Sequence, residues 1–551
     1  MAGLRELLEE LRRRGIKIST DGTTLDLDAP KGAVDAELRD RLVAAKADLV
    51  AHLSATPQTT DPHAPNQFDL SENQRALYYQ MQLDRHGYAY NVGFAGHLDG
   101  ALDVTALDQA LVALTHRHPM LRAAFSLEAG APIQTIGPMS RSVLALIPAT
   151  NLTEAEVETQ LQNQYQTPFD LEHSPLFRAH LWHLGPDRHT LLITVPHIII
   201  DGWSLWRLLA DDLPHAYDAC RAGKEPFVDR EDPRPFRDHV ANQAALLTSA
   251  DGERLWKRWD KALAGKVEPL DMPTDTLRPK RKAFDGGQEQ LSLSPAKQAA
   301  LDVYATHAGA TLPAVLSAAF AMVLARQSGR QNIIIGMPMS GRLDPSFADT
   351  LGYFVNPMPL PITVGSANSL EAVLRQAHEA IGFALDHQAL PLPIIIERLG
   401  LPRDPARNPL FDVNIAVQSP GPSSSLVRGM MLGAKAPPSP FGPLTMRAIA
   451  LPQQQALFDL TLEAVPADDG LHLSLKYDRS LFDGSTVFGL LSQFEFALGA
   501  FAAGAGAGSG SVSCVGDVAL DDGSGLVAGR GPVAAWPAGC LLDGVADQVA
   551  C

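Results

Sequence analysis

The clearest change of hydrophobic pattern along the chain lies just before residue 200. Residues 190–195 form a continuous apolar and β-branched run (TLLITV), and Pro196, His197, three isoleucines and an Asp-Gly pair follow it. Such a run predicts a buried strand, whose ladder pairing ends at Pro196 because proline has no N–H to donate. A helical pattern follows, which Pro214 is expected to kink or end, and its apolar face consists of Leu205, Leu208, Leu209 and Leu213. The pattern therefore places His197 and Asp201 at the exit of a packed strand.

The first 54 residues show a different pattern. Apolar residues recur at helical spacing in residues 4–11 and 38–53, while residues 16–18 and 24–27 alternate as strands do, around a turn at Asp21-Gly22. This predicts a small αββα unit whose exposed hairpin edge recruits another chain. The alternative is an extension packed on the next domain. Residues 55–66 are polar and rich in proline, which predicts a linker.

Strand and helix patterns alternate in the rest of the chain. A helical pattern covers residues 296–327 and leads into a β-branched strand at residues 332–336. Residues 502–511 consist mostly of alanine, glycine and serine, which predicts a flexible linker. A chain of 551 residues is too long for one core, so we expect an α/β protein of about three units.

Composition and charge exclude several classes of function. With 46% hydrophobic and 19% charged residues, the chain has the composition of a globular protein. Its net charge of −17 argues against nucleic-acid binding, which needs a basic face. No apolar run approaches the roughly 20 residues of a membrane helix, and no signal peptide is visible. No metal-ligand or disulfide spacing is found among the four cysteines, which favours a reducing cytoplasm: Cys220, Cys514, Cys540 and Cys551.

The histidine at the strand exit is the candidate for chemistry. A general base needs a pKa near neutrality and a ring fixed against its substrate, and His197 at a strand exit meets both conditions. The alternative is a hydrogen-bonded histidine at the edge of a core, and Asp201-Gly202 alone indicates only a turn.

The segment His197–Gly202 resembles the HHxxxDG motif of condensation domains of nonribosomal peptide synthetases. It departs from the motif in having Pro196 at the first histidine, and its continuation Trp203-Ser204 is typical of the family. Other stretches resemble the family's motifs in the family's order, over about residues 67–500: Leu70–Gln74, the RHxxLR-like Arg117–Arg122, Gly352–Leu360 (GxFVNxxPL), Asn408–Val413 with Gln418, and Asp478–Asp483.

This resemblance implies a fold of two chloramphenicol-acetyltransferase-like lobes, arranged as a V around a tunnel. We expect an N-lobe in residues 67–270 and a C-lobe in residues 271–500, with the crossing between them at residues 273–284. Residues 501–551 are then expected to be a flexible linker toward an adenylation domain.

The resemblance also implies the activity. Carrier proteins would deliver a donor acyl thioester and an acceptor aminoacyl thioester on phosphopantetheine arms, and the domain itself would bind no cofactor or metal. His197 would act as base or positioning group, the Gly202 amide would polarise the carbonyl, and Asp201 would form a structural pair with Arg122. Residues expected along the substrate tunnel are Pro196, Trp203, Ser204, Asn356 and Gln418.

The N-terminal unit is similar to TubC-type docking domains, on Asp21-Gly22, Leu25 and residues 29–33. The likeness implies that an acidic C-terminal segment of an upstream synthetase or polyketide synthase subunit docks on basic residues, which otherwise form a solvated face: Arg12, Arg13, Arg14, Lys17 and Lys31. Three alternatives stay open for the chain: an epimerisation domain, a degenerate condensation domain that only binds carrier proteins, and a pure interaction module. Trp203-Ser204 favours the subtype that takes L-configured donors.

Overall fold

The chain forms two units, residues 1–66 and residues 67–551, and each is described by itself. The computed structural model describes residues 17–20, 25–28, 38, 41–42, 66–83, 87–402, 404–418, 424–432, 436–451, 456–504, 514–518 and 520.

The first unit contains the predicted hairpin. Strands β1 (Lys17–Thr20) and β2 (Leu25–Asp28) pair antiparallel, with Ile18 opposite Leu27. Leu38 and Leu42 lie in helical conformation at i, i+4 spacing, and both are buried. Arg12, Arg13, Arg14 and Lys31 lie outside the described residues, and Lys17 is described by its backbone alone.

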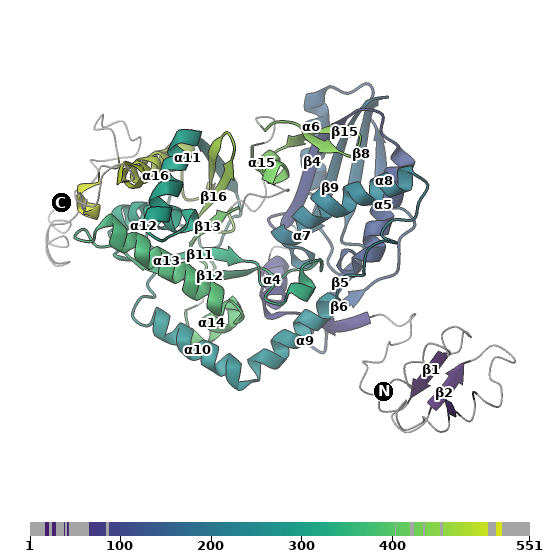
Figure 1. The fold of residues 1–551 in the computed structure, drawn as a ribbon, viewed down its shortest axis with the longest axis horizontal. Helices are drawn as coiled ribbons and strands as arrows, with labels where there is room; N and C mark the ends of the chain where they lie inside the picture. Colours follow the sequence, from purple (N-terminus) through teal and green to yellow (C-terminus); the bar gives the residue numbers. More distant parts are fainter. Residues whose placement is uncertain are drawn as a thin grey trace. The chain divides into compact units, whose positions relative to one another are not determined.

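In the second unit, one lobe is built on a six-stranded sheet, which we call the N-lobe sheet, with the order β14-β15-β4-β9-β8-β7. Helices α5 (Val104–Arg117) and α8 (Leu213–Arg221) pack together on one side, and α6 (Glu154–Tyr165) packs against β9 with its buried Val157 and Leu161 (Figure 1). The strands are β4 (Asn91–Asp99), β7 (Leu144–Pro148), β8 (Arg178–Gly185), β9 (Arg188–Pro196), β14 (Ser439–Phe441) and β15 (Leu444–Ile449).

A smaller sheet of three strands lies at the start of this unit. Its order is β3 (Asn66–Asp69), β6 (Ala131–Ile136) and β5 (Ala123–Glu128). Helix α4 (Glu72–Leu83) follows β3 directly, and the short η1 (Pro119–Arg122) leads into β5.

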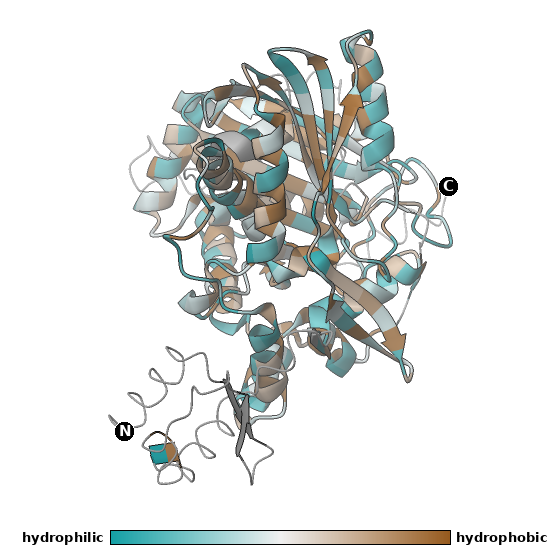
Figure 2. Ribbon diagram, turned by 90° about the vertical axis from the view of Figure 1, so that its right-hand side faces the viewer, coloured by the Kyte–Doolittle hydropathy of each residue, from teal (hydrophilic) through white to brown (hydrophobic). Residues whose placement is uncertain are grey.

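The other lobe is built on a second six-stranded sheet, the C-lobe sheet, with the order β10-β17-β16-β13-β11-β12. Its strands are β10 (Gly286–Leu293), β11 (Asn332–Met339), β12 (Asn356–Thr363), β13 (Val413–Val417), β16 (Leu460–Ala467) and β17 (Gly470–Asp478). Its helices are α11 (Pro295–His307), α12 (Leu312–Ser328), α13 (Leu370–His387), α14 (Leu392–Leu399), α15 (Ser424–Leu432) and α16 (Gly484–Gly504). Hydrophobic residues recur along the strands and the central helices of the unit (Figure 2).

The helical pattern predicted over residues 296–327 is divided into α11 and α12, which meet at a bend of 101°. Gly309 lies in the break with a φ of +63°, a conformation that glycine adopts without strain. The strand predicted at residues 332–336 is confirmed as part of β11. The helical pattern of this apolar stretch is almost continuous, so it did not indicate the bend between the two helices.

The predicted crossing between lobes at residues 273–284 is wrong. Phe236 of α9 (Phe236–Leu247) belongs to the core of the N-lobe, whereas Trp259 of α10 (Ala250–Leu263) already belongs to the core of the C-lobe. The chain therefore crosses between α9 and α10, and residues 273–284 lie on the C-lobe, where Arg278 pairs with Asp459.

The lobes are also not continuous in sequence. Strand β15 returns from the second half of the chain and pairs antiparallel with β4, with Met446 opposite Leu98. Phe347, Leu351 and Phe354 likewise pack in the core of the N-lobe. The expected boundary at residues 270 and 271 therefore does not separate the two lobes.

The last part of the described chain belongs to the C-lobe. Helix α16 runs to Gly504, and η6 (Val515–Asp517) follows, with Val515, Val518 and Leu520 buried in the C-lobe core. The expected flexible linker from residue 501 is therefore wrong for these residues. By length and composition α16 could span a membrane, contrary to the sequence-based expectation, but half of it is buried in the C-lobe.

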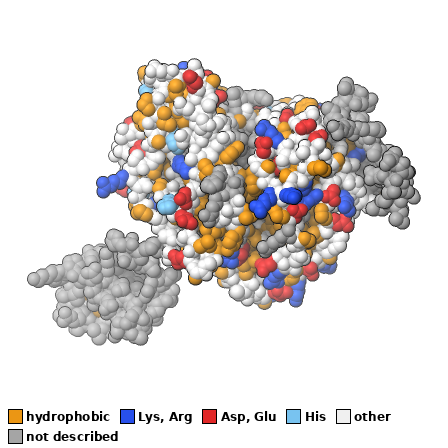
Figure 3. Space-filling model, turned by 180° about the vertical axis from the view of Figure 1, so that it is seen from behind, with side chains coloured by type: hydrophobic (Ala, Val, Ile, Leu, Met, Phe, Trp, Pro, Cys, Tyr) orange, Lys and Arg blue, Asp and Glu red, His pale blue; other side chains and the backbone are white. Residues whose placement is uncertain are grey.

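Charged residues are mixed over the surface. On the face seen in Figure 3, Lys and Arg side chains are interspersed with Asp and Glu and form no continuous basic area among the residues described.

Candidate active site

Backbone hydrogen bonds and buried side chains hold the turn that carries His197. Strand β9 ends at Pro196, which lies opposite Asn91 of β4, as predicted from the proline. The 3₁₀ turn η2 (His197–Ile199) begins there, and the His197 N–H donates to the Tyr90 carbonyl at 2.8 Å. The three isoleucines that follow are fully buried and anchor the turn in the N-lobe core. The histidine thus lies on a rigid element, which suits a residue that must hold a substrate atom within hydrogen-bond distance.

One hydrogen bond fixes the tautomer of His197. Its Nδ1 lies 2.6 Å from the carbonyl oxygen of Ile200. Because a carbonyl oxygen can only accept, Nδ1 carries the proton and Nε2 holds the lone pair of the neutral ring. The ring packs edge-to-face on Tyr353, with centroids 5.1 Å apart. Burial lowers the pKa of His197 and outweighs the Ile200 carbonyl and Asp201, which raise it. The ring is therefore in its basic form at neutral pH.

The expected pair between Asp201 and Arg122 is wrong, because Asp201 pairs with Arg342. The Arg342 guanidinium donates to both carboxylate oxygens of Asp201, at 2.7 and 3.2 Å. Burial raises the pKa of Asp201, but Arg342 and the hydrogen bonds from Ser204 lower it by more, so the carboxylate stays ionised. The backbone N–H of Phe354 also donates to Asp201, at 3.0 Å. Asp201 is thus a structural residue, as the resemblance implied, with a different partner.

Arg122 instead forms hydrogen bonds with backbone carbonyls of the N-lobe. It lies at the end of η1, and its guanidinium donates to the carbonyls of Thr115, at 2.9 Å, and Gly137. These bonds join the end of α5 to the end of β6. Arg342, which sequence reasoning missed, is 141 residues away from Asp201, in the connection between β11 and β12. Only its place in Ser340-Gly341-Arg342, shortly after the strand predicted at residues 332–336, could have indicated it.

Asp201 also caps the helix that follows. Its carboxylate accepts from the Ser204 N–H at 2.9 Å, at the start of α7 (Gly202–Arg207). The helix continues through the π-type η3 (Leu208–Asp212) into α8, so Pro214 does not end it. All four leucines of the predicted apolar face are buried, namely Leu205, Leu208, Leu209 and Leu213.

Residues 342–354 hold α7 at several points, and we call this segment the clasp. The Ser204 hydroxyl donates to the Gly352 carbonyl and accepts from the Gly352 N–H, both at 3.1 Å. The Trp203 indole N–H donates to the Ala348 carbonyl at 3.1 Å. With Arg342 on Asp201, these contacts attach the first turn of α7 to the second half of the chain.

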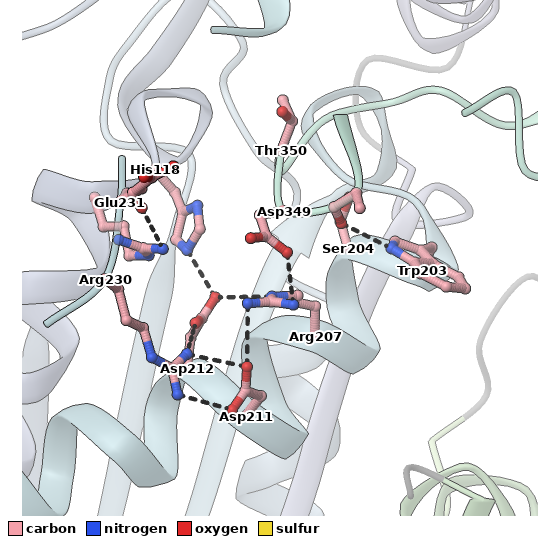
Figure 4. Close-up of polar contacts among 12 residues, drawn as sticks. His118, Trp203, Ser204, Arg207, Asp211, Asp212, Arg230, Glu231, Asp349 and Thr350 are labelled. Carbon is pink, nitrogen blue, oxygen red and sulfur yellow. Dashed lines mark hydrogen bonds and ion pairs between the residues drawn. The ribbon is translucent and has the colours of Figure 1, made fainter. Parts of the chain in front are cut away.

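An ionic cluster continues along α7 and η3 (Figure 4). Arg207 points toward Asp349 of the clasp, with an ion pair at 2.7 Å. Arg230 binds Asp211 and Asp212, both at 3.0 Å. The buried Asp212 also lies 3.0 Å from Nε2 of the equally buried His118. His118 is the histidine of the RHxxLR-like stretch, so this motif supports the helix that follows His197 rather than Asp201 itself.

Two protein-family models match the chain. The family model "Condensation domain" matches residues 65–519, and "TubC N-terminal docking domain" matches residues 4–54. The chain belongs to the condensation-domain family. One of the linear gramicidin synthase proteins of Brevibacillus parabrevis is 30% identical over 84% of this chain, and tyrocidine synthase 3 of the same organism is 31% identical over 81%. This chain spans only 6% and 7% of the lengths of those two synthases.

Solved structures show the same fold. The four-domain nonribosomal peptide synthetase AB3403 has a TM-score of 0.71 at 21% identity, over 81% of this chain and 34% of that one. The X-domain from teicoplanin biosynthesis also has a TM-score of 0.71, at 26% identity, over 84% of this chain and all of that one. The two-lobed fold expected from the motifs is thereby confirmed, together with the docking unit before the condensation domain.

The remaining expected site residues of the condensation domain do not all lie near His197. Pro196, Gly202, Trp203 and Ser204 flank it in the same turn and helix. Asn356 is buried instead, and its amide donates to the carbonyls of Gln388 and Leu390, both at 2.9 Å. The structure therefore gives Asn356 a structural role and does not support a contact with substrate. Gln418 lies at the end of β13, where its N–H donates to the Ala464 carbonyl, and its place along a tunnel stays a prediction.

Proposed function

We propose that the condensation domain joins a carrier-bound donor acyl or peptidyl thioester to a carrier-bound acceptor aminoacyl thioester through an amide bond. The observation that carries this proposal is the fixed tautomer of His197, with Nδ1 bound to Ile200 and the basic nitrogen at Nε2. A thioester is already activated, so a site that positions two substrates and accepts one proton supplies what the reaction needs.

The proposed step uses few groups. The acceptor amine attacks the donor carbonyl, Nε2 of His197 takes the amine proton, and the proton then goes to the leaving thiolate of the donor arm. The exposed Gly202, in the first turn of α7, offers its backbone N–H to the developing oxyanion. Asp201 takes no proton, because Arg342 holds it ionised. The residues of the clasp hold this arrangement in place.

The substrates of this reaction are carried by partner proteins. We expect carrier proteins upstream and downstream, each with a phosphopantetheine arm, while the domain itself supplies no cofactor. The unit matched to TubC-type docking domains is expected to bind the C-terminal segment of an upstream synthetase or polyketide synthase subunit. The cysteine pattern favours a cytoplasmic reaction.

Intact-mass spectrometry of two loaded carriers tests the proposal. After mixing with the protein, the acceptor carrier should gain the mass of the donor acyl group, and the donor carrier should return to its free holo form. A run in deuterated water separates epimerisation, which would exchange the α-hydrogen of a loaded aminoacyl group without joining the carriers. Unchanged masses with several matched carrier pairs would contradict amide bond formation.

A second candidate function is a platform that binds carriers without catalysing condensation. Two observations favour it: Pro196 replaces the first histidine of the motif, and the X-domain from teicoplanin biosynthesis is similar over its whole length. That X-domain has also been solved in complex with OxyB, and this complex is similar to 84% of the present chain at 25% identity. Carrier binding without a mass change would favour the platform.

A further inference from the structure

Two fully buried glutamines face each other between α4 and β6. The side-chain amide of Gln134 donates to the side-chain oxygen of Gln74 at 3.0 Å and to the Asp69 carbonyl at 2.8 Å. The Gln74 oxygen also accepts from the Ser71 N–H at 3.1 Å. Gln74 and Gln134 have no measurable exposure. Buried amides without partners are costly, and this pair leaves no hydrogen of either amide unused.

Only Gln74 of the two also contacts the turn that carries His197. Its side-chain nitrogen donates to the backbone carbonyl of Ile198 at 3.0 Å, in addition to the weaker bond to Gln134 at 3.3 Å. Ile198 is the middle residue of η2, the turn that begins at His197. The Ser71 N–H requires an oxygen and the Ile198 carbonyl requires a nitrogen, so these partners fix the orientation of the Gln74 amide.

The turn is also held at its start. The Tyr90 carbonyl accepts from the N–H of His197, and two further bonds run within the turn, from Ile200 N–H to the His197 carbonyl and from His197 Nδ1 to the Ile200 carbonyl. Gln74 thus holds the middle of the turn, while Tyr90 holds its start. Loss of either support would let the imidazole move relative to a substrate, and catalysis is sensitive to displacements of about 1 Å.

We propose that Gln74 is a positioning residue for His197, acting through the Ile198 carbonyl. The expected effect of Gln74 on the rate rests on the proposed function, whereas its expected effect on the position of the His197 ring does not. Gln134 donates to Gln74 and to the Asp69 carbonyl and not to the turn, so it provides a matched control on the same hydrogen-bond pair.

The variants Gln74→Met and Gln134→Met test this role. Each removes one buried amide of similar size, and only the first removes the bond to Ile198. We expect Gln74→Met to lower kcat in the carrier assay at least about tenfold with little change in KM, and Gln134→Met to stay within about threefold of the wild type. If Gln74→Met does not fold, the double variant Gln74→Met/Gln134→Met serves instead, because it leaves neither glutamine amide buried against an apolar side chain in place of its partner.

A spectroscopic measurement separates this proposal from the proposed function. In full-length protein labelled with ¹⁵N-histidine, the Nδ1 proton that disappears in His197→Ala reports the bond to Ile200. It should shift or exchange faster in Gln74→Met, or in the double variant, and remain in Gln134→Met. An unchanged signal, or equal losses of kcat in both single variants, would overturn the positioning role. A shifted signal in a protein that makes no amide product would support the positioning role and reject the proposed function.

Discussion

Arg342 donates to both carboxylate oxygens of Asp201, and the two side chains are 5% and 2% exposed. The arginine comes from the connection between β11 and β12, while the aspartate caps α7 directly after the turn that carries His197. The geometry of the site therefore depends on a residue from the second half of the chain. A guanidinium suits this place because its planar fork binds a carboxylate through two parallel bonds.

Arg342→Ala should lower the free energy of unfolding by about 3–5 kcal/mol, because it leaves the buried Asp201 carboxylate without its counter-charge. Denaturant unfolding followed by tryptophan fluorescence measures the change. Arg447→Ala is the control, since Arg447 pairs with Asp99 at 3.0 Å on the surface and such pairs contribute about 1 kcal/mol or less. Equal stability of Arg342→Ala and wild type would show that the pair does not hold the fold.

The site could be predicted from sequence where its signal was local. The strand exit, the turn after Pro196 and the histidine lie within ten residues, and their hydrophobic pattern reports their structure directly. The partner of Asp201 could not be identified in this way. Arg122 and Arg342 both lie next to recognisable sequence patterns, and those patterns do not show which of the two arginines contacts Asp201. Only the three-dimensional structure shows that the Arg122 guanidinium donates its hydrogen bonds to backbone carbonyls near η1.

The same distinction applies to the fold. Single elements such as β9, β11 and the docking hairpin were predicted, because alternation and β-branched runs are properties of short segments. The division into lobes was not, since it depends on which core each helix joins. The sequence of α10 does not show whether the helix packs beside α13, as it does, or beside α8. The sequence of β15 likewise does not indicate that the strand pairs with β4.

The stability of the protein should depend on pH through His239. Burial, with Arg342 nearby, lowers the pKa of His239 from 6.5 to about 4, and its ring packs 4.5 Å from that of Phe354. The unfolded chain then binds more protons between these two values, so the free energy of unfolding falls as pH decreases from about 6.5 to 4. His239→Phe should flatten this part of the curve in urea unfolding at a series of pH values. An unchanged slope would show that His239 is not the group responsible.

Deletion of residues 1–54 should abolish pairing with an upstream subunit and spare condensation when loaded carriers are supplied at high concentration. Docking raises the effective concentration of the donor carrier and does not alter the barrier of the chemical step. Turnover as a function of carrier concentration measures both effects. If the truncated protein remains inactive under saturating carriers, the first unit is part of the catalytic fold.

Pro196→His should change the rate of condensation by less than about tenfold, or roughly 1.4 kcal/mol of barrier. Pro196 shapes the end of β9 with a φ of −77°, which other residues also adopt, and the proposed base is His197. The assay is the same carrier assay at saturating substrates. A gain of several orders of magnitude would mean that the natural domain lacks a required group, and the platform function would then be the better account.

The most direct test of the central claim is the single-turnover rate of amide formation by wild type and His197→Ala, with both loaded carriers in excess of their dissociation constants. The account predicts that the wild type transfers the donor group to the acceptor carrier. In the variant the rate should fall by roughly 10²-fold or more, the usual contribution of a positioned base, with the same unfolding midpoint as the wild type. A well-folded His197→Ala protein that forms the amide at nearly the wild-type rate would contradict the assignment of His197 as the base.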